Sequence, residues 1–153
     1  MTAQVAVRGH VADAMVTCPK TLGPHADVDD VRTLFDDDHV HMALVVAPDG
    51  RLLTTIERPD IPPAALASTP ATEFGTLDGR TVSASDPLHT ATTRMARDGR
   101  RRLAVTDGSG RLLGLLCLKR SGDGYCSDEG IRARADERER TRSSRMFARG
   151  LSF

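Results

Sequence analysis

Residues 36–41 combine residue types that can bind a metal ion. Three aspartates precede His39 and His41, and carboxylates beside imidazoles are common zinc ligands. In a strand, the two histidines would share one face. A charged helix end that runs into a strand start explains the same residues without a metal. We therefore expect no metal site here.

Glycines at positions 108, 110 and 114 approach the spacing of a dinucleotide-binding fingerprint. The last interval is one residue too long, and the glycines fall in a predicted hairpin turn, where the fingerprint needs a strand-to-helix turn. The chain has no Gly-x-Ser-x-Gly elbow and no Cys or Ser paired with a recognisable base. We predict no catalytic residue, no enzymatic activity and no required cofactor.

The elements that would position functional residues occur twice. Gly-Arg-Leu-Leu stands at residues 50–53 and again at 110–113, sixty residues later. The same offset, without gaps, aligns further identical pairs, which are Thr21 with Thr81, Thr33 with Thr93, Asp38 with Asp98, and Val45 with Val105. A constant offset over roughly forty residues predicts two halves of a pseudosymmetric fold.

Both copies predict the same order of elements. In copy two, an apolar entry at 81–82 precedes a helix that starts near Ser85-Asp86-Pro87 and stops at Asp98-Gly99. A hairpin of strands over 103–105 and 111–118 follows. In copy one, the equivalent elements are a helix over 27–35 and strands over 42–46 and 51–56. A helix over 11–15 precedes copy one, and the region between the copies predicts one short helix over 64–67.

Composition limits the possible partners and compartment. The chain has 21 basic and 21 acidic residues, so no net charge directs it to nucleic acid or membrane. The longest apolar run, around 112–118, is too short to span a bilayer, and no signal peptide is visible. The three cysteines, Cys18, Cys117 and Cys126, show no metal-type spacing. We expect reduced thiols in a cytoplasmic protein.

This layout resembles the cystathionine-β-synthase-type (CBS) domain, of which two in tandem form a Bateman module. The resemblance covers residues 8–128. It rests on Val11-Ala12-Asp13-Ala14-Met15, the entries Thr21-Leu22 and Thr81-Val82, and the strand–turn–strand segments 43–56 and 103–116. It implies a stand-alone α/β (α+β) protein of two βαββα domains with pseudo-twofold symmetry. The expected divisions are domain one at 8–62, a linker at 63–79, domain two at 80–128, and a charged C-terminal helix and tail at 129–153.

The family also implies adenosine-containing ligands, such as AMP, ATP or S-adenosylmethionine, in the clefts between the domains. Its pattern at the end of each last strand is Gly, two residues, Thr or Ser, two residues, Asp. In the family the glycine lets backbone approach the ligand, the hydroxyl binds phosphate or ribose, and the carboxylate accepts from both ribose hydroxyls. The expected ligand-binding residues of both copies are Asp60, Glu57, Thr54, Thr21, Gly114, Cys117, Arg120, Thr81 and Arg102.

Neither copy keeps the full family pattern. Copy one has Thr54, Glu57 and Asp60 at the three positions, and copy two has Gly114, Cys117 and Arg120 in their place. Glu57 beside a phosphate would cost about 1 kcal/mol even in water. The site around Asp60 is thus expected to suit adenosine or a sulfonium compound better than ATP. Arg120 cannot accept from a ribose but could hold a phosphate. The alternative is that both clefts have lost their ligands.

Charge differs between the copies. The first helix region is acidic, with Asp27, Asp29, Asp30, Asp36, Asp37 and Asp38, and the second is basic, with Arg94, Arg97, Arg100, Arg101 and Arg102. In the family these helices pack against a second module, so opposite charges favour a head-to-tail homodimer. Charges that only face water would contribute little.

The C-terminal segment provides an alternative function. Residues 129–153 contain seven arginines against four acids, but Glu137 and Glu139 interrupt the basic patch and aromatic interleaving is missing, so we expect no nucleic-acid binding. Two functions therefore stand open: a regulatory sensor of adenosyl ligands, and a ligand-free dimeric scaffold that acts through the arginine-rich helix.

Overall fold

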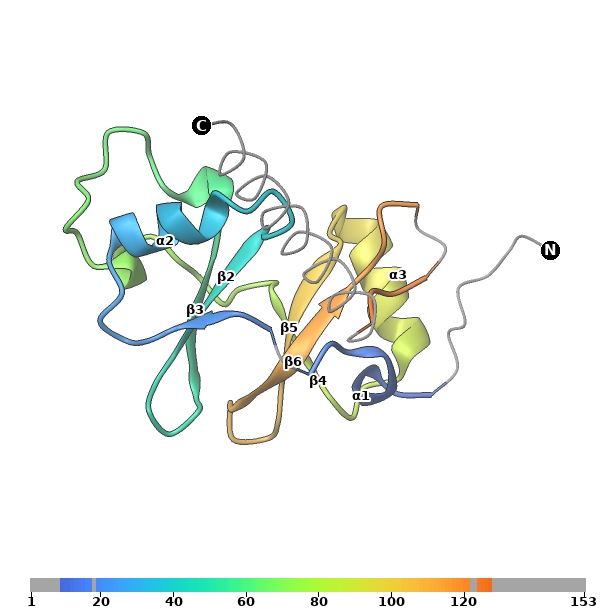
Figure 1. Cartoon of the computed structure of the whole chain (residues 1–153). Coiled ribbons are helices and arrows are strands. Elements are labelled where there is room, and N and C mark those ends of the chain that lie inside the picture. Colours follow the sequence, from blue (N-terminus) through green and yellow to red (C-terminus); the bar gives the residue numbers. More distant parts are fainter. Residues whose placement is uncertain (1–8, 18, 122–123, 128–153) are drawn as a thin grey trace, which may run out of the picture.

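The computed structural model describes residues 9–17, 19–121 and 124–127. The fold is α+β and contains two three-stranded sheets of the same topology (Figure 1). In each sheet the first strand runs parallel to the second, which is antiparallel to the third. The first sheet consists of β1 (Thr21–Leu22), β2 (Met42–Val46) and β3 (Leu52–Glu57). The second consists of β4 (Thr81–Ser83), β5 (Arg102–Thr106) and β6 (Leu112–Cys117). The two-repeat α+β fold expected from the sequence is confirmed.

Strand register repeats at the sixty-residue offset. Thr21 is aligned with Leu44 in the first sheet, and Thr81 with Ala104 in the second. Both central strands also carry a register shift at the same place, between residues 45 and 46 and between residues 105 and 106. The two sheets are therefore equivalent down to their irregularities.

One helix covers each sheet. In α2 (Val28–Phe35), Asp27 caps the N-terminus, because its carboxylate accepts from the backbone N–H of Asp30 at 2.9 Å, and Asp30 returns the contact at 3.0 Å. In α3 (Leu88–Asp98), the C-terminus ends at Gly99, whose φ of 67° is left-handed and suits glycine. Both caps agree with the helix limits expected from the sequence.

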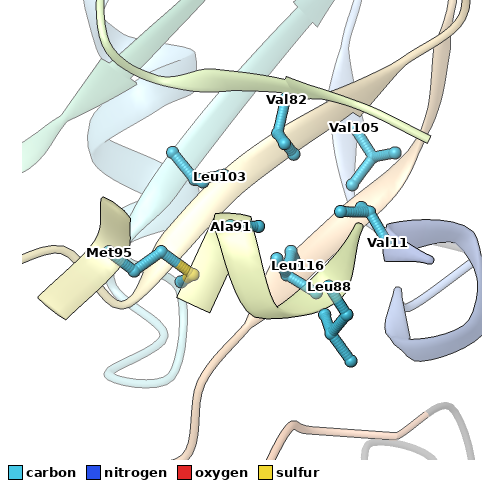
Figure 2. Packing of buried hydrophobic residues seen from close by; sticks show 8 residues of the cluster. All are labelled: Val11, Val82, Leu88, Ala91, Met95, Leu103, Val105 and Leu116. Atoms are coloured by element: carbon cyan, nitrogen blue, oxygen red, sulfur yellow. The ribbon is translucent and has the colours of Figure 1, made fainter. Parts of the chain in front are cut away.

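Each helix buries three residues at equivalent positions. These are Val28, Val31 and Phe35 in α2, and Leu88, Ala91 and Met95 in α3. Figure 2 shows the α3 residues packed with strand residues of the second sheet and with Val11. Each repeat therefore has its own apolar core.

The leading segment of each repeat packs on the other repeat. Val11 in α1 (Val11–Ala14) belongs to the second core, and Val16 exchanges hydrogen bonds with Leu115 of β6 at 2.8 and 2.9 Å. Sixty residues later, Ala71 in the 3-10 turn η2 (Ala71–Glu73) belongs to the first core. The stretch between the copies thus contains the counterpart of α1. Its helical turn is at 71–73, whereas residues 64–67, where a short helix was expected, are not helical.

The two Gly-Arg-Leu-Leu segments meet where the repeats join. The backbone N–H of Leu52 donates to Gly110 O at 3.0 Å, and the N–H of Leu112 donates to Gly50 O at 2.9 Å. These reciprocal bonds relate equivalent atoms, as a pseudo-twofold axis requires. A third apolar cluster spans this junction and contains Met42, Leu44, Leu52 and Ala104. The contact between the two repeats is therefore made by the duplicated segment itself.

Within the described residues, no helix is long and apolar enough to cross a membrane. The helix expected after Ser127 and the tail at 129–153 lie outside the described residues.

Candidate functional site

An ion-pair network joins the end of the first repeat to the start of the second. Its centre is Arg80, in the turn before β4, with only 7% of its surface exposed. The two terminal nitrogens of Arg80 donate to the two carboxylate oxygens of Asp60 in η1 (Arg58–Asp60), with an Nη2–Oδ1 distance of 3.0 Å. Arg80 also pairs with Glu57 at 3.1 Å. A bidentate guanidinium–carboxylate contact is strong and directional.

The acids of this network have further partners. Arg100, after α3, donates to Glu57 Oε2 at 2.9 Å, and the backbone N–H of Glu57 donates to Asp60 at 2.8 Å. Burial raises the pKa of Asp60, but the hydrogen bonds from Arg80 and Glu57 and the charges of Arg80 and Arg100 outweigh it. The pKa of Asp60 therefore lies below its ordinary value of 3.8. At neutral pH, Asp60 is ionised and is bound to arginine.

A pocket of about 380 Å³ lies beside this network, between the two repeats. His41 of the lining directly precedes β2, and Glu57 is the last residue of β3. The other lining residues run from the end of α3 to the start of β5. The lining residues are His41, Glu57, Asp98, Gly99, Arg100, Arg101 and Arg102. This volume is within the range of small-molecule sites. Three consecutive arginines, against the acids Glu57 and Asp98, give this lining an excess of positive charge that could hold an anion.

The titratable groups of the pocket respond to its positive charge. Burial, followed by the charges of Arg102, Arg58 and Arg101, lowers the pKa of His41 below 6.5. Burial, together with the nearby charge of Arg101, also lowers the pKa of Arg102. Burial is the largest cause of both shifts, and the charges of the neighbouring arginines add a repulsion of further positive charge. A bound anion would relieve that repulsion.

The structure divides the nine expected ligand-binding residues. Glu57 and Arg102 line the pocket, and Asp60 adjoins it through Arg80. Thr21 is exposed at the start of β1, and Thr81 is half-buried at the start of β4. The remaining four, Thr54, Gly114, Cys117 and Arg120, lie elsewhere on the repeats and are not among the lining residues of this pocket.

Thr54 and Gly114 have packing roles that are complementary. A Cβ atom on Gly75 would overlap the Thr54 hydroxyl, and a Cβ atom on Gly114 would overlap the Val16 carbonyl oxygen and lie 2.9 Å from Met15 Sδ. At the sixty-residue offset, Thr54 corresponds to Gly114 and Gly75 corresponds to Met15. In both repeats a glycine therefore faces a larger residue, but the glycine is on the strand in one repeat and on the opposing segment in the other. Gly114 thus accommodates Met15.

Cys117 and Arg120 follow the same strand but differ in surroundings. Cys117 is buried and is aligned with Arg102 across the β5–β6 pair. Its sulfur lies 2.8 Å from that of Cys126. Arg120 lies in an exposed turn after β6. The second ligand site expected around Gly114, Cys117 and Arg120 therefore stays a prediction.

Sequence reasoning missed Arg80, Arg101 and His41. Arg80 immediately precedes the Thr81 entry, and Lys20 holds the same position before Thr21, so a basic residue at both repeat entries was the available signal. Arg101 was assigned to a dimer surface because its helix region is basic. In the fold, Arg101 lines the pocket together with His41 and Glu57 of the first repeat.

Comparison with known proteins gives a consistent result. The family model of the CBS domain matches residues 72–120, and comparison with curated protein sequences gave no match. The chain is similar to an AMP-bound CBS domain protein from Pyrobaculum aerophilum, with 24% identity and a TM-score of 0.60 over 74% of this chain and 94% of that chain.

Two further solved structures have the same fold. CBSX2 in complex with AMP has 21% identity and a TM-score of 0.61, over 84% of this chain and 98% of that chain. The cytosolic domain of the Mg²⁺ channel MgtE in complex with ATP has 21% identity and a TM-score of 0.60, over 71% of this chain and 46% of that chain.

Proposed function

Because this chain contains a CBS domain and has the fold of a CBS pair, we propose that it is a regulatory module that binds an adenosine nucleotide in the pocket between its repeats. The observation that carries the proposal is the run Arg100-Arg101-Arg102 in that pocket. The AMP and ATP complexes of proteins with this fold support the choice of an adenosine nucleotide.

The charge of the pocket favours a phosphate over a sulfonium group. Glu57 was expected to repel phosphate, but its carboxylate is paired with Arg80 at 3.1 Å and with Arg100 at 2.9 Å. Arg80 and Arg100 together balance the charges of Glu57 and Asp60, so the expected penalty is largely cancelled. Arg101 and Arg102 then provide the excess positive charge. This balance supports AMP or ATP ahead of S-adenosylmethionine, which carries a positive sulfonium centre.

Isothermal titration calorimetry with AMP, ATP, adenosine and S-adenosylmethionine tests the proposal. We expect AMP and ATP to bind at least about tenfold more tightly than adenosine, because a hydrogen bond to a charged group contributes roughly 1.5–3 kcal/mol. Arg101→Ala should weaken nucleotide binding by a similar factor. Arg111→Ala is the matched control, since Arg111 is exposed and does not line the pocket. Equal affinity for adenosine and AMP would contradict a phosphate site.

One observation favours the alternative of a ligand-free interaction module. Asp60, the residue that keeps the family's ribose-binding aspartate, is bound to Arg80. A ribose would have to displace that arginine or bind without the carboxylate. If none of the adenosine compounds binds and thermal stability is unchanged by each, the interaction module becomes the better description. A nucleotide at 100 times its dissociation constant would add about 2.7 kcal/mol of stability.

A further inference from the structure

Two thiols face each other at the end of the second sheet. Leu118 and Tyr125 form an antiparallel bridge, flanked by hydrogen bonds from Cys126 N to Cys117 O at 2.7 Å and from Lys119 N to Gly124 O at 2.8 Å. This pattern places Cys117 and Cys126 directly opposite each other at a hydrogen-bonded position. The Cα atoms of such a pair are about 5.5 Å apart, within the range that a disulfide spans.

The sulfur atoms are also close enough to bond. Both cysteines are free thiols, and their Sγ atoms are 2.8 Å apart. A disulfide needs about 2.05 Å, so small side-chain rotations are sufficient and the backbone can stay in place. We propose that Cys117 and Cys126 are a redox modification site, at which a peroxide or a low-molecular-weight disulfide forms a reversible Cys117–Cys126 disulfide.

The two sulfurs differ in access. Cys117 is 7% exposed, whereas Cys126 is partly exposed. Burial and the hydrogen bond with Cys126 raise the pKa of Cys117 to about 12, so this thiol stays protonated at neutral pH. Cys126 is therefore the sulfur that reacts first with an oxidant, and Cys117 is the resolving partner.

The reaction balances with a peroxide as oxidant. The Cys126 thiolate attacks one peroxide oxygen and breaks the O–O bond, which gives a sulfenic acid, while the released hydroxide takes up a proton to become water. The Cys117 sulfur then displaces the sulfenic hydroxyl, which leaves with the Cys117 proton as a second water. Two thiols and hydrogen peroxide thus become one disulfide and two waters.

The disulfide would fix a segment that packs on two elements. Tyr125, next to Cys126, contacts Thr92 of α3 through its hydroxyl and lies 3.9 Å from Met95 Sδ. Cys117 is aligned with Arg102 of β5. In the oxidised protein, the bond would therefore connect the segment 124–126 covalently to β6 beside Arg102. This consequence does not depend on ligand binding, so failure of the proposed nucleotide site would leave the redox site standing.

Thiol counting on the full chain tests the proposal. After hydrogen peroxide or oxidised glutathione, the number of alkylated cysteines should fall from three to one, and peptide mapping should show Cys117 linked to Cys126. Dithiothreitol should restore all three. The oxidised protein should melt at a temperature about 5 °C or more above the reduced protein.

Two cysteine variants provide the controls. Cys18→Ser should oxidise in the same way as the wild type, and Cys126→Ser should lose the disulfide and the increase in melting temperature. Cys126 is preferred to the buried Cys117 for substitution, because replacing a partly exposed side chain disturbs the packing less. A disulfide that includes Cys18 or joins two chains would overturn the proposal. Oxidation of Cys126 to sulfinic acid with Cys117 still free would also overturn it.

Discussion

Asp60 and Arg80 connect the two repeats through two parallel hydrogen bonds, made by the two oxygens of one side chain and the two terminal nitrogens of the other. A carboxylate that accepts from two donors at once is the arrangement expected for a ribose diol. Arg80 supplies those two donors from within the chain. The aspartate that matches the family pattern is therefore a structural residue in this conformation.

We predict that Asp60→Asn destabilises the protein by about 3 kcal/mol. This change leaves the buried Arg80 without its bidentate partner, and loss of one partner of a buried ion pair costs roughly 3–5 kcal/mol. The lower end is expected because Glu57 still pairs with Arg80. Urea unfolding monitored by circular dichroism measures the difference. Asp78→Asn is the matched control, because Asp78 is exposed. Equal losses in both variants would refute a special role for Asp60.

The same contact predicts an acid sensitivity. Because the folded-state pKa of Asp60 lies below the ordinary value of 3.8, its stabilising effect is present above that value. The effect is lost as the pH falls through the folded-state pKa. As the pH falls below about 4, the free energy of unfolding should therefore fall more steeply for the wild type than for Asp60→Asn. Parallel curves for the two proteins would show that Asp60 is not the group responsible.

His41 predicts how nucleotide binding depends on pH. Burial and the charges of Arg102, Arg58 and Arg101 lower its pKa below 6.5, and a bound phosphate would raise that pKa again. Binding should therefore take up a proton, and affinity for AMP should increase between about pH 7.5 and pH 5.5. Calorimetry in buffers of different ionisation enthalpy measures the proton uptake.

His41→Gln provides the comparison for this experiment. The second ionisation of the phosphate, near pH 6, affects both proteins equally, so the difference between them isolates the histidine. We expect the variant to bind AMP with less proton uptake and a flatter pH profile. Identical profiles would place the phosphate away from His41.

The pattern of small residues predicts unequal costs for two glycine substitutions. Gly114→Ala should destabilise the protein by roughly 1–3 kcal/mol, because its Cβ atom would overlap the Val16 carbonyl oxygen and crowd Met15 Sδ at 2.9 Å. Gly108→Ala, with nothing within 4 Å of the new atom, should have little effect. Differential scanning calorimetry compares the two. A harmless Gly114→Ala would mean that Met15 and Val16 can move aside.

The head-to-tail homodimer remains a prediction. Asp29 in α2 and Arg97 in α3 are exposed and carry opposite charges, so they are suited to meet between two chains. In a mixture of Asp29→Cys and Arg97→Cys proteins, with native cysteines replaced, we expect disulfide crosslinks between the two variants. Preferred crosslinking of Asp29→Cys with itself would indicate the opposite orientation. Analytical ultracentrifugation of the wild type establishes whether a dimer forms.

The sequence was sufficient to predict the helices and strands within each repeat. It did not reveal that the leading segment of each repeat packs on the other repeat. Helix limits at Asp27 and Gly99 follow from local capping chemistry, so they were predictable. The crossing of α1 to the second sheet depends on contacts with residues about a hundred positions away, such as Val16 with Leu115. Hydrophobic periodicity in a short segment does not identify such a partner.

The site shows the same division between local and distant information. Glu57 was predicted from the family pattern and Arg102 was among the expected ligand-binding residues, and both line the pocket. The partner of Asp60 was not, because Arg80 lies in a turn and no periodic pattern predicts that its side chain is buried. The sequence showed the charge of Glu57 but not its pairing with Arg80, so the expected repulsion of a phosphate stays a prediction to be tested by binding.

The crossed leading segments have a consequence for how the chain unfolds. Val11 completes the core of the second sheet and Ala71 that of the first, so each half lacks part of its core when the other is absent. Separation of the repeats would remove these residues and break the Leu52–Gly110 and Leu112–Gly50 bonds together. Unfolding of either half therefore exposes the apolar core of the other half. The described part of the chain should lose its structure in one cooperative transition, as a single thermodynamic unit made from two copies.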